Sequence, residues 1–245
     1  MPLPKTISDA ERTKKISSFL RDSFNDYIAA RVLFRDQLPQ QASILSSTAI
    51  EKCVKAMLAV QGNESHGHLQ TAHRNFLRNF NPKLHSKLNN DFLVLNQKVY
   101  ALRYSDDLPA GYNLVIASRE FLAEMDFTIA AMFSCFSLNQ GNRRMETPYE
   151  VAVAGADHRL WVDNHVLHKI PNALFTYAEP QFVYEVRNDP RRGLMEVTYI
   201  ANGPSKQNGF LRSGWTPRDD IGVKYDLAFG APTAQTPDDA QSLGD

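Results

Sequence analysis

Apolar side chains recur at intervals of three and four from Ser8 to Phe136, with polar and charged residues between them. Such intervals place the apolar positions on one face of an α-helix. Pro39 is expected to end the first helix and Gly62 the second. The pattern predicts helices over 8–38, 41–60, 82–103 and 112–136 and a short helix that ends at Leu77, and these pack most simply as an antiparallel bundle.

From Asn139 the apolar positions alternate or cluster instead, and the segments YEVAVAG, HRLWVDNHVL, ALFTYAEPQFVYEVRN and LMEVTYIANG are typical of β-strands. Asn188–Gly193 predicts a hairpin loop between the last two segments. The fold class is therefore expected to be α+β. We expect a helical bundle domain at 1–138, a linker around 140–144, a small antiparallel β-rich domain at 145–230 and a disordered tail at 231–245.

The charges of the chain balance, because Lys and Arg together number 27 and so do Asp and Glu. No global field favours nucleic acid or an anionic membrane, so a site for either would have to be a local patch. The chain shows no signal-peptide core and no apolar run long enough to span a membrane, which favours a cytoplasmic location. Its two cysteines fall within helical patterns and are expected to be buried and reduced.

Known catalytic motifs are missing from the sequence: it has no GxGxxG, no GxxxxGK[ST], no GxSxG and no HExxH. Nucleotide-fold enzymes, serine hydrolases and zincins are accordingly disfavoured, and we expect no cofactor. The histidines in HGHLQTAH, at positions 66, 68 and 73, suggest a metal site. However, ligands at i and i+2 do not share a helix face and no cysteine is near, so no metal is expected.

The stretch YALRYSDDL ends a helical pattern with Arg103 and Tyr104. Arginine can hold a phosphate with two parallel hydrogen bonds, and tyrosine can stack on a base. The alternative is structural, because a cation in the last turn complements the helix dipole. Lys55 has a similar ambiguity: it forms an ordinary i, i+4 pair with Glu51, or it points into the same groove as Arg103.

The pieces AIEKCVKAML at 49–58, HGHL at 66–69 and YALRYSDD at 100–107 occur in the order and spacing of HEPN domains, and residues 15–137 resemble that family. The resemblance implies a bundle of four to five helices. It also implies a contact of His68 with the ligand groove, which adds His68 to the ligand contacts expected from Lys55, Glu51, Arg103 and Tyr104. Many HEPN domains are dimeric, metal-independent ribonucleases with an Arg-x(4–6)-His motif. Others bind nucleotide, RNA or protein, and often accompany nucleotidyltransferases in toxin–antitoxin, stress or defence systems.

The sequence departs from the nuclease motif, since no histidine follows Arg103 at the required spacing. The formal match is Arg78 with His85, which spans Pro82. We therefore expect a non-catalytic, dimeric module that binds nucleotide or RNA in a bacterial stress, defence or toxin–antitoxin setting, with a nucleotidyltransferase as possible partner. The alternatives are a ribonuclease that uses Arg78 and His85, and a module for protein interaction and dimerisation.

Overall fold

The computed structural model describes residues 9–63, 65, 67–140 and 143–201. Outside these residues lie Ser8, the first residue of the first predicted helix, His66 of the segment HGHLQTAH, and everything predicted after Ala201. None of the helices in the described ranges combines the length and the apolar character needed to cross a bilayer.

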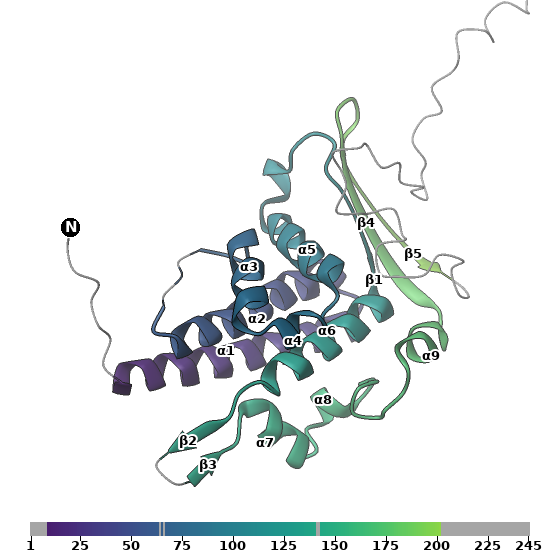
Figure 1. Cartoon of the computed structure of the whole chain (residues 1–245). Coiled ribbons are helices and arrows are strands. Elements are labelled where there is room, and N and C mark those ends of the chain that lie inside the picture. Colours follow the sequence, from purple (N-terminus) through teal and green to yellow (C-terminus); the bar gives the residue numbers. More distant parts are fainter. Residues whose placement is uncertain (1–8, 64, 66, 141–142, 202–245) are drawn as a thin grey trace, which may run out of the picture.

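The described chain begins with a long helical hairpin. α1 (Asp9–Arg35) and α2 (Pro39–Val60) lie side by side, with α6 (Ser118–Phe133) against them (Figure 1). Shorter helices cover one side of this group: α3 (Thr71–Phe80), α4 (Pro82–His85), α5 (Asn90–Val99) and the 3-10 helix η1 (Tyr100–Asp107).

The apolar stripes predicted for the first two helices form the core. Leu20 and Tyr27 of α1 are completely buried, as are Ile50 and Met57 of α2. Gly62, the predicted stop of the second helix, has a φ of 74°, a left-handed conformation that costs glycine little. Cys53 is buried as expected, but Cys135 is exposed, so that part of the cysteine prediction is wrong.

The helix boundaries near Pro39 and Asn89 differ from the prediction because caps and proline act locally. Pro39 does not end α1, which stops at Arg35; it opens α2, where its missing amide costs nothing. The single helix predicted over 82–103 is divided, because the Asn89 side chain accepts hydrogen bonds from the amides of Asp91 and Phe92 and starts α5 afresh.

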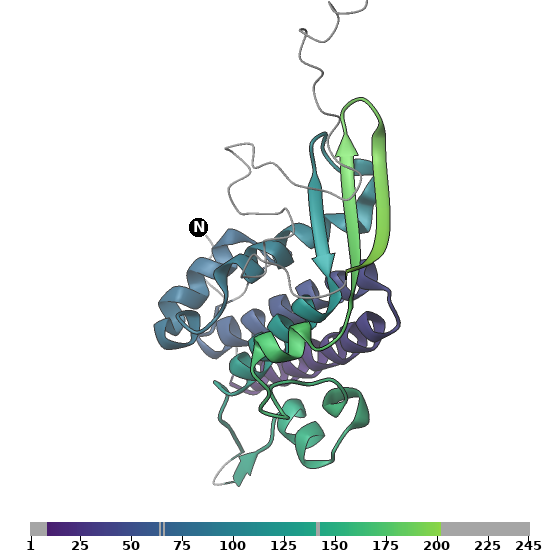
Figure 2. The same cartoon turned by 90° about the vertical axis from the view of Figure 1, so that its right-hand side faces the viewer.

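A three-stranded antiparallel sheet stands beside the helices, with the strand order β1–β4–β5 (Figure 2). The hairpin of β4 (Gln181–Asp189) and β5 (Gly193–Ala201) confirms the loop predicted there. β1 (Asn113–Ala117) was predicted as helix, which is wrong. Its run of apolar residues becomes a strand because β4 supplies hydrogen-bonding partners along its whole length.

Between the bundle and β4 the chain is mostly helical, so the first two predicted strands of the C-terminal half are wrong, as is the start of the third, whose end is confirmed as β4. These segments form α7 (Pro148–Ala154), α8 (His158–Trp161) and α9 (Asn172–Tyr177). α7 starts with a capping box, since the Thr147 hydroxyl accepts from the Glu150 amide and the Glu150 carboxylate accepts from the Thr147 amide. Of the predicted linker at 140–144, Gln140 lies in β2 (Leu138–Gln140) and Arg143 and Arg144 lie in β3 (Arg143–Met145), and the two strands pair antiparallel as the β2–β3 hairpin.

A buried arginine ties the C-terminal helices to the bundle. Arg31, with no exposed surface, pairs with Asp126 of α6 and donates to the backbone carbonyls of Arg159 and Val162. Burial alone would lower the pKa of this guanidinium, but the Asp126 carboxylate and Tyr27 raise it above its ordinary value. The guanidinium therefore stays charged and joins three segments.

The hydrophobic core runs through both halves of the chain. Tyr149 of α7 packs on Phe133 of α6, with ring centroids 5.8 Å apart, and on Phe24 of α1 at 6.4 Å. Phe175 of α9 and Val186 of β4 belong to the same buried cluster. The boundary predicted between residues 138 and 145 therefore does not separate two cores.

Candidate functional site

Glu51 of α2 organises the first part of the site. Its Oε1 atom accepts a hydrogen bond of 2.7 Å from Lys55, one turn further along the helix. Its Oε2 atom accepts one of 3.1 Å from the Leu69 amide and lies 3.5 Å from Nδ1 of His68. Lys55 also donates to the carbonyl of Gly67 at 2.7 Å. The carboxylate and the ammonium group together hold the segment 67–69 against α2.

Tyr100 connects that segment to Arg103. Its hydroxyl oxygen lies 2.6 Å from Nε2 of His68 and accepts a hydrogen bond of 2.7 Å from Arg103. The rings of His68 and Tyr100 stack with centroids 3.9 Å apart, and the Arg103 guanidinium carbon lies 5.1 Å from the centre of the Tyr100 ring. Because the Tyr100 hydroxyl accepts from Arg103, its own proton can be donated to His68 Nε2, which leaves Nδ1–H facing Glu51.

The contacts therefore run without a break from Lys55 through Glu51, His68 and Tyr100 to Arg103, and we name these five residues the Glu51 network. Lys55 and Arg103 do not touch, but three shared side chains place them on the same side of the molecule. The two ends differ in exposure, since the Lys55 side chain is 15% exposed and Arg103 lies at the surface.

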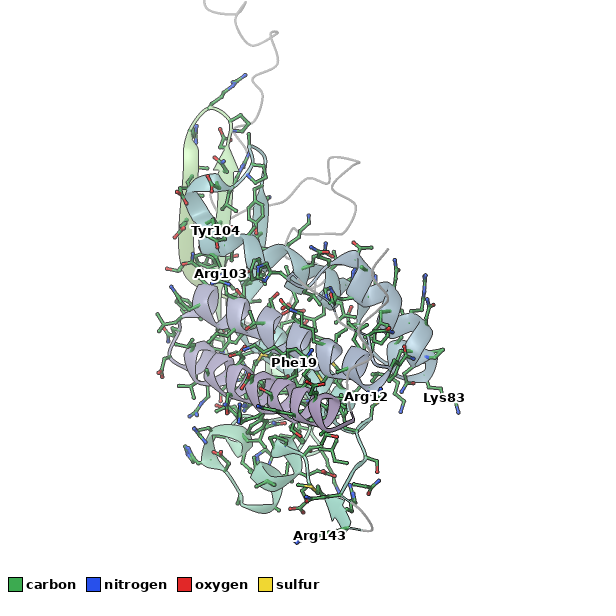
Figure 3. The ribbon with its side chains drawn as sticks, turned by 90° about the vertical axis from the view of Figure 1, so that its left-hand side faces the viewer. Arg12, Phe19, Lys83, Arg103, Tyr104 and Arg143 are labelled. Carbon is green, nitrogen blue, oxygen red and sulfur yellow. The ribbon has the colours of Figure 1, made fainter. Side chains whose placement is uncertain are left out.

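Tyr104 lies beside the network without joining it. Its backbone, at φ −129° and ψ 67°, breaks the helical turns of η1, and its ring is 56% exposed. Figure 3 shows Tyr104 next to Arg103, near the sheet, whereas Arg12 lies toward the start of α1. An exposed aromatic ring next to an exposed guanidinium is an arrangement that suits a stacked base and its phosphate.

A small cavity opens beside Lys55. It has a volume of about 260 Å³, and Lys15, Phe19 and Lys55 are among the residues that line it. Two ammonium groups and one phenyl ring around one hollow suit an anionic ligand with an aromatic part. The cavity extends the cationic side of the Glu51 network toward the start of α1.

Arg78 and His85 lie on two different helices. Arg78 lies in the last turn of α3 and His85 at the end of α4, and between them Asn81 caps α4 by accepting from the Leu84 amide at 2.9 Å. Among the residues that the structure describes, no hydrogen bond or ion pair joins the two side chains or links either to the Glu51 network. Their catalytic role stays a prediction without geometric support.

The nearby His73 has a structural environment. Its Nδ1 accepts a hydrogen bond of 3.1 Å from the Gln70 amide, and its Nε2 lies 3.0 Å from the Ser65 hydroxyl. Burial lowers the pKa of this imidazole, the Lys55 charge lowers it further, and Glu51 acts in the opposite direction. Within the described ranges, no group of three or more histidine, cysteine, aspartate or glutamate side chains could hold a metal ion.

Tyr100 was not among the ligand residues predicted from the sequence, although it is the first residue of the stretch YALRYSDDL, which contains Arg103 and Tyr104. The signal was its position three residues before Arg103, since residues at i and i+3 are neighbours on a helical surface. The sequence gives no such signal for the contact of Tyr100 with His68, because the two residues are 32 positions apart in the chain.

Comparison with known proteins gives one family. Residues 16–127 match the model of the HEPN domain, a span that begins in α1, ends in α6 and contains the whole Glu51 network. No curated protein and no solved structure gives a significant match.

Proposed function

We propose, from the premise that residues 16–127 of this chain form a HEPN domain, that the domain binds RNA or a nucleotide through the Glu51 network and Tyr104. Arg103 carries the proposal. Its guanidinium makes a single hydrogen bond within the described part of the chain, to Tyr100, so its other N–H groups are available to a phosphate. Tyr104, one residue further, supplies an exposed ring for a base.

The rest of the network supports this role by fixing Arg103 in place. The Tyr100 ring lies under the guanidinium, and His68 holds the Tyr100 hydroxyl from the other side. A cation held in one position loses less conformational freedom when it binds than a freely rotating side chain does. Lys55 and Lys15 would extend the positive surface to a second phosphate at the cavity beside Lys55.

Titration of a fluorescent single-stranded RNA at low salt, followed by anisotropy, tests the proposal. Arg103→Ala should weaken binding about tenfold and reduce the slope of log affinity against log salt by about 0.7, the loss expected for one phosphate contact on a single strand. Arg78→Ala is the matched control, since Arg78 is also an exposed arginine on a helix and, among the described residues, has no hydrogen bond to the Glu51 network. Equal losses in the two variants, or none in Arg103→Ala, would reject the proposal.

A second pair of variants tests the Lys55 end. Lys55 and Lys52 are both on α2, and each pairs with a carboxylate at 2.7 Å, Lys55 with Glu51 and Lys52 with Asp26. Lys55→Met should weaken RNA binding severalfold and Lys52→Met should leave it unchanged, because the Asp26 pair lies outside the network. If Lys52→Met weakens binding as much, the positive charge of the surface as a whole is responsible.

The second candidate function is metal-independent RNA cleavage, which one observation favours: Tyr100 brings His68 and Arg103 together in space. His68 would take the proton of a 2′-hydroxyl, the 2′-oxygen would bond to phosphorus as the bond to the 5′-oxygen breaks, and water would protonate that oxygen. Arg103 would stabilise the charge on the phosphorane. Because Nε2 of His68 is occupied by Tyr100, the ring must first be released, and binding is therefore the leading proposal.

Product analysis separates the two candidates. Cleavage would give fragments ending in a 2′,3′-cyclic phosphate, in the presence of a metal chelator, and His68→Ala would abolish them. His85→Ala tests the pair predicted from the sequence in the same assay. Intact RNA that remains bound to the wild-type protein supports binding alone.

We further propose a cytoplasmic homodimer in a bacterial stress, defence or toxin–antitoxin setting, with a nucleotidyltransferase as the partner to test first. The proposal rests on the HEPN domain at residues 16–127. Light scattering on the purified protein measures the oligomeric state, and co-purification with a nucleotidyltransferase encoded beside it tests the partner.

A further inference from the structure

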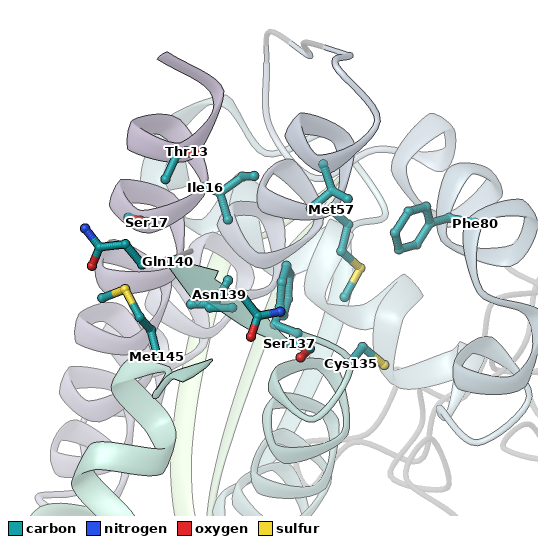
Figure 4. A pocket seen from close by; sticks show the side chains of 13 residues that line it. Thr13, Ile16, Ser17, Met57, Phe80, Cys135, Ser137, Asn139, Gln140 and Met145 are labelled. Carbon is teal, nitrogen blue, oxygen red and sulfur yellow. The ribbon is translucent and has the colours of Figure 1, made fainter. Parts of the chain in front are cut away.

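A second cavity, of about 640 Å³, lies away from the Glu51 network, where α1, α2 and α3 meet the β2–β3 hairpin (Figure 4). Ile16, Met57 and Phe80 come from the three helices, and Ser137, Asn139 and Met145 from the chain after α6. α2 separates it from the cavity beside Lys55, because Met57 faces one hollow and Lys55 the other.

Among the residues that the structure describes, the walls of this cavity carry no charged side chain, since each lining residue is apolar or a neutral threonine, serine, cysteine, asparagine or glutamine. A ligand with a net charge would lose its hydration there and find no counter-charge, which is costly. The cavity therefore selects a neutral ligand, in contrast to the lysine-lined hollow on the other side of α2.

Hydrogen-bonding groups lie on the hairpin side. Figure 4 shows Asn139 between Met57 and Met145, with Gln140 close to Met145. The carboxamides of Asn139 and Gln140 make no hydrogen bond to another described residue, so each offers a donor and an acceptor to a ligand. An apolar body with a polar group at one end would place that group against the hairpin.

The shape favours a small molecule over a protein surface. The volume is within the range of roughly 300–1,000 Å³ found for small-molecule pockets, and parts of the chain far apart in sequence surround it. Val60 and Met145, which also line it, are 45% and 44% exposed. A bound apolar ligand would cover these solvent-exposed apolar side chains at the rim of the cavity.

We propose that this cavity is a binding site for a neutral small molecule with an apolar body and a carbonyl, hydroxyl or amide group that hydrogen-bonds to Asn139 or Gln140. The site is separate from the phosphate-binding surface proposed above and does not depend on it.

Nile red, a neutral apolar dye with one carbonyl group, is the probe. The full chain should bind it saturably at one dye per chain, with blue-shifted emission. Met145→Arg should weaken binding at least tenfold by placing a charge at the rim, and Asn139→Asp should weaken it by adding a charge without changing the size. Leu194→Arg is the matched control, since Leu194 is 42% exposed and lies far from the cavity on β5. It should bind the dye as the wild type does.

The rate at which Cys135 is alkylated gives an independent test of the proposal. It lines the cavity and is exposed, whereas Cys53, the other cysteine of the chain, is buried, so alkylation by iodoacetamide reports on Cys135. Saturating dye should slow alkylation at least fivefold. Non-saturable binding, equal affinities in Met145→Arg and Leu194→Arg, or unchanged alkylation would overturn the proposal. The proposal would also be overturned if the protein were a dimer that Met145→Arg dissociates without loss of dye affinity. In that case a second copy of the chain would occupy the cavity.

Discussion

The Tyr100 hydroxyl lies 2.6 Å from Nε2 of His68, and the two rings stack with centroids 3.9 Å apart. One residue comes from the 3-10 helix after α5 and the other from the segment that follows α2. Because Arg103 donates to the same hydroxyl, this pair fixes the position of the cation on which the proposed RNA contact depends.

Tyr100→Phe should keep the ring stack and remove only the hydroxyl. Arg103 would lose its acceptor, so we expect RNA affinity to fall about three- to tenfold and the free energy of unfolding to fall by about 1 kcal/mol. Anisotropy and urea titration measure the two effects. Tyr112→Phe is the control, because the Tyr112 hydroxyl donates to the Lys98 carbonyl at 3.2 Å and lies outside the network. It should lower stability without changing affinity, and wild-type affinity in Tyr100→Phe would contradict the positioning role.

The low pKa of His73 should make the protein less stable in acid. In the folded state the pKa of this imidazole lies below its ordinary value of 6.5. The unfolded state therefore binds the proton more readily. Stability from this group is complete above pH 6.5 and is lost as the pH falls through the lower folded value. Protonation of Nδ1 would also break its hydrogen bond with the Gln70 amide.

Urea unfolding of the wild type and of His73→Gln between pH 7.5 and 5 tests this expectation. The variant should be less stable at pH 7.5 and should lose less stability on acidification. His158→Gln, which changes a histidine in the short helix α8, should follow the wild-type pH profile. A His73→Gln profile parallel to that of the wild type would exclude His73 as the source of acid sensitivity.

Arg31→Met should be strongly destabilising, because it leaves the Asp126 carboxylate buried without its partner. Removal of one member of a buried ion pair costs about 3–5 kcal/mol. The double variant Arg31→Met, Asp126→Leu should lose less than the sum of the two single losses, since it leaves no unpaired charge. Additive losses in urea titrations would show that the pair is not energetically coupled.

A fragment of residues 9–137 should not fold stably, although it contains the whole HEPN match. It lacks β4, the partner of β1, and it exposes the faces of Phe24 and Phe133 on which Tyr149 packs. A fragment of residues 9–201 keeps these contacts and should unfold cooperatively. Circular dichroism during thermal unfolding compares the two. A cooperative transition in the shorter fragment would show that the helices are stable without the C-terminal half.

The helical half could be predicted because its signals are local. Leu20, Phe24 and Tyr27 follow the helical period and are buried in α1, and a glycine with positive φ follows α2. The wrong predictions in the C-terminal half concern short elements. α7 has seven residues, too few to display a helical period, and its Val151 and Val153 imitate strand alternation. The capping box at Thr147 and Glu150 was a local signal that outweighed this pattern in the structure.

The site was predictable only in part, for the same reason. Glu51 and Lys55 are one helical turn apart, and the structure contains their ion pair. Arg103 and Tyr104 stood out as a cation next to an aromatic ring. That Tyr100 meets His68 could not be inferred, because the two residues are 32 positions apart and no spacing rule links them.

The order of residues alone specifies the helical stripes and the β4–β5 hairpin, since each depends on neighbours within a few positions. It also specifies the resemblance to HEPN domains, which depends on the order and spacing of three short segments. Contacts between residues far apart in the chain determine the rest. β1 becomes a strand because β4 lies beside it, and α8 joins the bundle because Arg31 binds Asp126 and the carbonyls of Arg159 and Val162. α7 joins it through Tyr149 and α9 through Phe175. The partners of buried hydrogen-bonding groups and buried charges can lie anywhere in the sequence. They come into contact only when the whole chain has folded.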